Sequence, residues 1–144
     1  MMRNCMALLR NDDSGSVAIE FALIGPAFLG MFMGILQIGL GMQNYNALRS
    51  ISADVSRYAV VNYQTSNRLT TTQLQTYANS IAAAPPYGLT SSRFTAAVTT
   101  AATQRVAGAT EYTIQLTYQI PSLLQVIGIG EIPLSYSRPI FLLS

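Results

Sequence analysis

The sequence has 144 residues, of which half are apolar and only 10% are charged, against roughly 25% in an ordinary soluble domain. It has no histidine, no lysine and one cysteine, which excludes Ser-His-Asp and Cys-His catalysis, imidazole or multi-cysteine metal sites, a Schiff-base lysine and an intrachain disulfide. The net charge of +2 comes from eight scattered arginines, with no cluster that would follow a phosphate backbone. We therefore expect no enzyme, no cofactor, no metal and no nucleic-acid partner.

The first 15 residues form a short polar head with two arginines and two aspartates. Basic residues beside a membrane span favour the cytoplasmic side, so Arg3, Arg10 and the initiating amine predict a cytoplasmic N-terminus. Arg49 and Arg57, beyond the apolar stretch, weaken this prediction. Cys5 precedes that stretch, whereas a lipoprotein cysteine follows one, so we expect no lipid on it.

An uncharged stretch follows, and within residues 21–42 Gln37 is the only strongly polar side chain. Twenty-two helical residues span about 33 Å, enough to cross a hydrocarbon core of about 30 Å. A cleaved secretory signal needs an apolar stretch of only about 7 to 15 residues, so this one is too long. The sequence predicts a single membrane-spanning helix over about residues 17–42, with the C-terminal part exported.

Glu20 lies at the edge of this helix, where an ionised carboxylate is unfavourable and its presence has to be explained. An ionised acid costs on the order of 2.5 to 3.5 kcal/mol at the bilayer centre and less near the interface. A capping box from Ser16 would need an acid at position 19, which is Ile19. A first-turn acid favoured by the helix dipole and a carboxylate in the headgroup layer both remain open.

Residues 15–21 read GSVAIEF, between the charged leader and the apolar run. With Ala22, Leu23 and Pro26 after it, this string resembles the processing site of type IV prepilins. It looks most like the TadE/TadG-like pseudopilins of the tight-adherence (Tad) pilus, and the specific part of the resemblance spans about residues 10–45. Phe21, where major Tad pilins usually carry tyrosine, favours the pseudopilin branch.

The resemblance implies that a prepilin peptidase cuts between Gly15 and Ser16, so that residues 1–15 are a cleaved leader. A glycine suits a protease that binds an extended substrate, because it interrupts the helix that we expect to start beyond it. Ser16 departs from the aromatic first residue of many type IV pilins. Counted from Ser16, Glu20 is the fifth residue, and cleavage places a new α-amino group four residues away from it. The resemblance implies that Glu20, followed by Phe21, pairs with the amine of an adjacent subunit and sets axial register; pairing within one chain is the alternative.

The resemblance also implies a function: a minor pilin, pseudopilin or assembly factor of a Tad (type IVb/Flp) pilus, acting in pilus biogenesis, adhesion and biofilm formation. Its partners would be the prepilin peptidase, other pilin or pseudopilin subunits, the Tad inner-membrane assembly platform and membrane lipid. Its location would be the bacterial inner membrane, or an extracellular pilus after incorporation. The alternative is an uncleaved single-pass envelope protein whose exported domain binds a ligand or another protein.

Small residues recur every fourth position along the apolar helix. Such a row lets helices approach closely in lipid, although small residues are common in membrane helices and the spacing also arises by chance. The proline in the row should kink or locally loosen the helix. The row that we expect to serve helix packing consists of Ala18, Ala22, Pro26, Gly30 and Gly34.

Helical periodicity continues past the apolar run and predicts one long helix over residues 16–62, with a break within residues 39–46 as the alternative. Residues 63–71 read as a loop, and residues 72–84 as a second helix that Pro85 and Pro86 end. Alternating residues predict strands over 94–99, 112–120 and 132–138, the last extended to about 142. We expect an α+β fold in which residues 63–144 form an exported domain, with a three- to four-stranded antiparallel sheet packed on the long helix.

The strand over residues 112–120 alternates most cleanly, with Glu111 and Thr113 on the polar side and Ile114 and Leu116 on the apolar side. A half-buried sheet face explains this pattern, and we prefer it to edge pairing with another subunit. The apolar segment over residues 121–130 is either a subunit contact or a folded-back loop.

Overall fold

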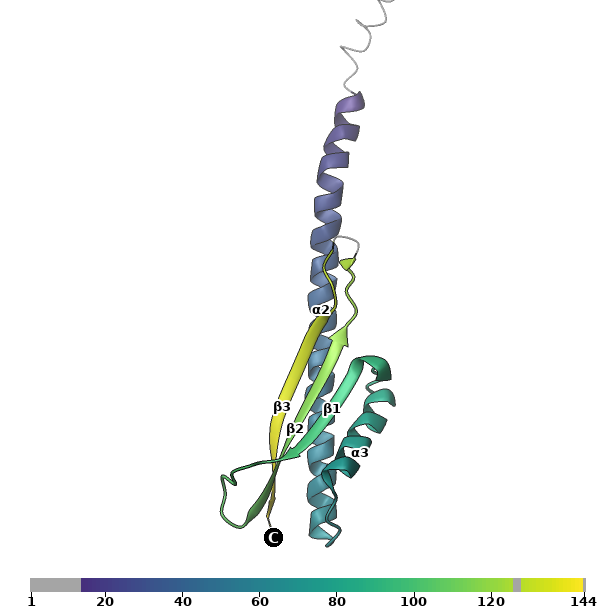
Figure 1. Ribbon diagram of the computed structural model, residues 1–144. Coiled ribbons are helices and arrows are strands. Elements are labelled where there is room, and N and C mark those ends of the chain that lie inside the picture. The colour runs from purple at the N-terminus through teal and green to yellow at the C-terminus, as the bar shows by residue number, and fades with distance from the viewer. Residues whose placement is uncertain (1–13, 126–127, 144) are drawn as a thin grey trace, which may run out of the picture.

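The protein is a long helix with a small α+β domain packed on its C-terminal half (Figure 1). This computed structural model describes residues 14–125 and 128–143; most of the proposed leader, with Cys5, lies outside the described residues. The elements in chain order are α2 (Ser14–Gln64), α3 (Thr71–Ala83), the short 3-10 helix η1 (Ser91–Arg93), β1 (Phe94–Thr100), β2 (Ala109–Ile120) and β3 (Ile132–Leu143).

Helix α2 runs without interruption for 51 residues, about 77 Å, and extends two residues beyond the predicted range at each end. It continues through Pro26 and through residues 39–46, so the predicted alternative of two helices joined by a loop is wrong. Its two halves differ in burial. Residues 17–36 are largely exposed, whereas Leu48, Ile51 and Val55, at spacings of three and four, are fully buried against the domain.

Helix α3 starts one residue before its predicted position. Thr70 caps it in a capping box: its hydroxyl accepts a hydrogen bond from the backbone N–H of Gln73, whose side chain accepts one from the backbone N–H of Thr70. Tyr77 of α3 stacks on Tyr58 of α2 with a centroid distance of 4.0 Å, which ties the two helices together.

The three strands form one antiparallel sheet in the order β1-β2-β3, with Val98 opposite Ile114 and Leu116 opposite Tyr136. The predicted α+β fold is therefore confirmed. Both helices cover one face of the sheet (Figure 1). The core between them is apolar and includes Leu48, Ile51 and Val55 from α2, Leu74 and Ala78 from α3, and Ile114, Leu116 and Ile120 from β2.

Strand β2 differs from the prediction in two ways. It is the central strand, so edge pairing through it is wrong; within the described residues the free edges belong to β1 and β3. It also begins at Ala109, and its first part is covered on the face away from the helices. Glu111, expected on a polar face, is only 1% exposed, because the chain that joins β1 to β2 folds back over it.

Candidate functional site

The most unusual surface of the molecule is the bare half of α2. None of its most apolar 18-residue window is buried, and the helix is long and apolar enough to cross a membrane; α2 is the only such helix in the described part of the chain. Phe21 and Leu23 are 76% and 74% exposed. An apolar surface of this extent needs a covering of lipid or of other protein. Other large apolar side chains exposed along it are Ile24, Phe28, Leu29, Met31, Phe32 and Ile35.

The residues predicted to take part in processing lie at the start of this helix. The backbone is helical from Ser14, so the expectation that the helix starts beyond Gly15 is wrong, and Gly15 and Ser16 both lie in its first turn. Helix ends open easily, because their first N–H groups lack partners within the helix. A peptidase that needs an extended substrate would therefore have to unwind only this terminal turn.

Glu20 and Phe21 follow on the next turn, and both are exposed. The first turn holds no acidic residue, so the interpretation of Glu20 as a first-turn acid is wrong. The reason is the early start of the helix at Ser14, which places Glu20 six residues further along.

The predicted row of small residues is open. Apart from the adjoining backbone of the helix itself, a Cβ atom added at Gly30 or Gly34 would meet no atom of the described chain within 4 Å. Near the start of the row, a Cβ at Gly25 would lie 3.8 Å from the ring of Phe21. The structure thus presents Ala18, Ala22, Pro26, Gly30 and Gly34 along bare helix and brings no other element against them.

Gln37 is the first residue of α2 that the domain buries, although Ile38 and Met42 beyond it remain exposed, and the sequence did not reveal its role. Its side chain is buried and holds the segment that joins β2 to β3: Nε2 donates to the carbonyl of Pro121 at 3.3 Å, and Oε1 accepts from the N–H of Leu123 at 2.8 Å. One amide therefore satisfies a backbone acceptor and a backbone donor. The available signal was that Gln37 is the single strongly polar residue in the apolar stretch.

Beyond Gln37, an apolar groove of about 400 Å³ runs between α2 and the adjoining ends of β2 and β3. Tyr45, which also lines the groove, packs edge-on against Tyr136, with 5.8 Å between the two ring centroids. The groove contains no acid or base that could do chemistry. Its lining includes Ile38, Gly41, Met42, Ile120, Ile132 and Leu134.

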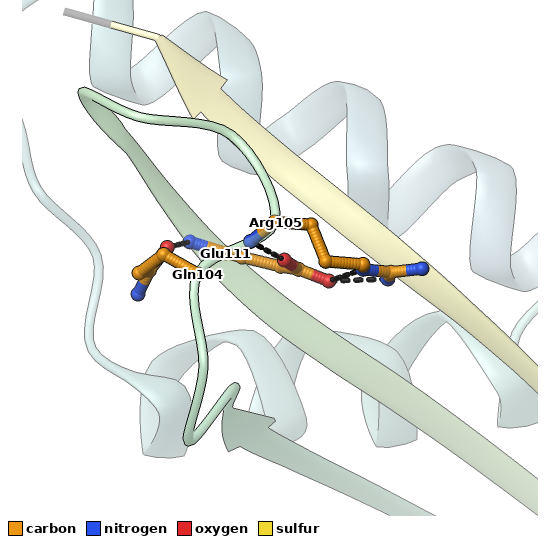
Figure 2. Close-up of polar contacts among 3 residues, drawn as sticks. All are labelled: Gln104, Arg105 and Glu111. Carbon is orange, nitrogen blue, oxygen red and sulfur yellow. Dashed lines mark hydrogen bonds and ion pairs between the residues drawn. The ribbon is translucent and has the colours of Figure 1, made fainter.

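At the far end of the sheet, Glu111 is held by two neighbours from the β1–β2 connection (Figure 2). Its carboxylate accepts hydrogen bonds from the backbone N–H of Arg105 at 3.1 Å and from Nε at 2.8 Å, and forms an ion pair with Nη2. The backbone N–H of Glu111 donates to Oε1 of Gln104. The hydrogen bonds from the Arg105 side chain hold the pKa of Glu111 below its ordinary value despite burial.

This arrangement pins a connecting segment and has no feature of an active site. Arg105 also lies over the ring of Phe141 at 5.4 Å, so the loop is fastened to β3 as well. Within the described residues, no three side chains of histidine, cysteine, aspartate or glutamate gather as a metal site would need.

We expect Arg105→Met to destabilise the domain strongly at pH 7 and less as the pH falls. Because the folded-state pKa of Glu111 is lowered, the pair stabilises the fold above the ordinary glutamate pKa and loses this contribution as the pH falls through the lowered value. Urea unfolding of the protein in detergent micelles at pH 7 and pH 3 measures the difference. Arg138→Met, at an exposed arginine of β3, is the matched control and should show no such pH dependence. An equal loss at both pH values for Arg105→Met would contradict the role of the charge.

A second polar contact ties the segment after α3 to α2. The hydroxyl of Tyr87 donates to Oδ2 of Asp54 at 2.7 Å. Burial, and then the hydrogen bond to Asp54, raise the pKa of Tyr87 to about 12. The phenol therefore remains protonated at neutral pH and acts as a structural donor.

Comparison with known proteins matches one part of the chain. Residues 15–57 match the model of a protein family described as TadE-like protein. The matched segment lies wholly within α2 and covers its bare half, Gln37 and most of the half that packs on the sheet. The comparisons with curated proteins and with solved structures gave no match.

Proposed function

We propose, from the match of residues 15–57 to the TadE-like family, that the chain is a pseudopilin of the Tad pilus system: a minor subunit or assembly factor of the pilus. It would act in pilus biogenesis, and through the pilus in adhesion and biofilm formation. The observation that carries the proposal is the coincidence of the family match with the bare helix. The match begins at Gly15, the predicted cleavage position, and then follows the surface that must be covered by something other than this chain.

A bare helix joined rigidly to a folded domain suits a subunit that exchanges one apolar environment for another. In the membrane, lipid covers residues 17–36; in a filament, the helices of neighbouring subunits would replace the lipid. The row of small residues from Ala18 to Gly34 supports such contacts, since small side chains let helices pack closely. Close packing matters here because apolar side chains gain little free energy by leaving lipid.

Processing by a prepilin peptidase would create the second part of the assembly surface. Cleavage after Gly15 leaves a positive amine on Ser16, one helical turn before Glu20. In a water-poor filament each charge alone is costly, and a pair between the amine of one subunit and Glu20 of the next offsets much of that cost. Such a pair forms only at one axial offset, so it would set the register between subunits.

The proposal places the protein in the bacterial inner membrane with its N-terminus in the cytoplasm and the α+β domain exported. Its partners are the peptidase, other pilin or pseudopilin subunits, the inner-membrane assembly platform and lipid. In this role it has no catalytic activity of its own, and the one chemical event it undergoes is its cleavage by the peptidase.

Intact-mass spectrometry of the protein from cells tests this proposal. We expect a mature chain that begins at Ser16, and accumulation of the full chain when Gly15 is replaced by tryptophan or when the peptidase gene is deleted. Gly30→Trp, a glycine replaced in the open part of the same helix, is the control and should be cleaved normally. A chain that retains residues 1–15 in normal cells would instead favour an uncleaved envelope protein with an exported binding domain.

A further inference from the structure

The exported end of the bare helix lies beside the domain. Residues 17–36 are 20 residues, or about 30 Å of helix, which equals the thickness of the hydrocarbon core. The next residue, Gln37, is the first one that the domain buries, through the β2–β3 connection, while Ile38 and Met42 beyond it remain 66% and 65% exposed. This connection therefore lies beside the exported end of the apolar surface of α2, whether the span ends at residue 36 or at Met42.

The described part of this connection, residues 121–125 and 128–131, is suited to contact with lipid. Leu123 and Ile129 are 41% and 43% exposed, and the sequence from 121 to 130 has no charge. Two of its backbone donors find partners inside the loop: the N–H of Ile129 donates to the carbonyl of Leu124, and the N–H of Gly128 to that of Gln125. Satisfied backbone groups remove the main cost of placing a loop against apolar lipid.

Charge appears where the headgroup layer would begin. Glu131, the first charged residue after the loop, forms an ion pair with Arg93 at 3.1 Å, and both side chains are partly exposed. Apolar side chains with charged neighbours behind them are typical of surfaces that lie in a membrane interface.

We propose that the described part of the β2–β3 connection is a second membrane contact, in which Leu123 and Ile129 enter the boundary between headgroups and acyl chains. The contact would hold the domain against the bilayer beside its own helix. This inference rests on the proposed single span. A phospholipid surface, and not a second copy of the chain, is the occupant because the loop lies beside the exported end of the apolar surface of the single span.

Fluorescence quenching in vesicles tests the contact. The full chain, with Cys5→Ser and one new cysteine carrying the environment-sensitive dye NBD, is reconstituted into phosphatidylethanolamine–phosphatidylglycerol vesicles. Some of the lipids carry a nitroxide at a shallow or a deep acyl position. The new cysteines are Leu123→Cys and Ile129→Cys in the loop. Val106→Cys is the matched control, since Val106 is 43% exposed in the β1–β2 connection, at the opposite end of β2. Phe28→Cys, in the middle of the bare helix, reports on the span itself.

We expect the shallow nitroxide to quench both loop positions at least threefold more than position 106, and the deep nitroxide to quench position 28. If position 28 is quenched and neither loop position exceeds position 106, the loop contact is wrong while the span stands. If position 28 is not quenched, the span and the proposed function fail together. The loop labels could instead escape quenching by lipid and be shielded from aqueous iodide only at high protein density. That result would mean that a second copy of the chain covers the loop, and it also overturns the inference.

Discussion

Replacement of Glu20 by glutamine is expected to leave cleavage after Gly15 intact and to lower incorporation into pili by a factor on the order of 100 or more. The side chain keeps its size and loses only its charge. Removing one partner of a buried ion pair costs about 3–5 kcal/mol, because the other charge stays buried without compensation. Immunoblots of sheared pili against the membrane fraction measure incorporation, and intact mass shows whether the cut has occurred.

The control for this variant is Glu131→Gln, which makes the same change of charge at a glutamate 49% exposed on the exported domain. It should leave incorporation near the wild-type level. Normal incorporation of Glu20→Gln would mean that its charge does not set register between subunits. A defect already present at the cleavage step would assign Glu20 to recognition by the peptidase.

Replacement of Gln37 by leucine is expected to release the β2–β3 connection from α2. The substitution keeps the apolar character of the helix and leaves the carbonyl of Pro121 and the N–H of Leu123 without their partner. Each buried polar group left unsatisfied costs about 1–3 kcal/mol. Amide hydrogen exchange at Leu123 should therefore accelerate at least fivefold, with little change in the core strands.

The chain offers a matched control in Gln43→Leu, the same change at an exposed glutamine of the same helix. It should leave exchange at Leu123 unchanged. Unaltered exchange in Gln37→Leu itself would mean that the connection is held by its apolar contacts alone.

The elements of the fold could be predicted because each has its own local pattern. The 3–4 spacing of Leu48, Ile51 and Val55 marks the buried stripe of α2, and the alternation from Ile114 to Ile120 marks β2. Both patterns follow from helix and strand geometry and need no knowledge of partners. The Pro85-Pro86 pair marks the end of α3 for a similar reason, since proline cannot continue a helix.

Features that depend on distant contacts could not be predicted in this way. The partners of Gln37 lie 84 and 86 residues further along the chain, so its position in an apolar run indicated only that it was unusual. In the strand alternation, Glu111 occupies a position that should face outward. The structure buries it because Gln104 and Arg105 fold back over it. The start of α2 at Ser14 was missed because Gly15 was expected to break the helix.

The unbroken course of α2 has a mechanical consequence. A force applied to the sheet reaches the apolar end through one continuous helix, since α2 has no break where its bare half meets its packed half. The hydrogen bonds of Gln37 also join the β2–β3 connection to this helix. An assembly platform that moves the exported domain would therefore move the membrane-spanning end of α2 by the same distance, without stretching a linker.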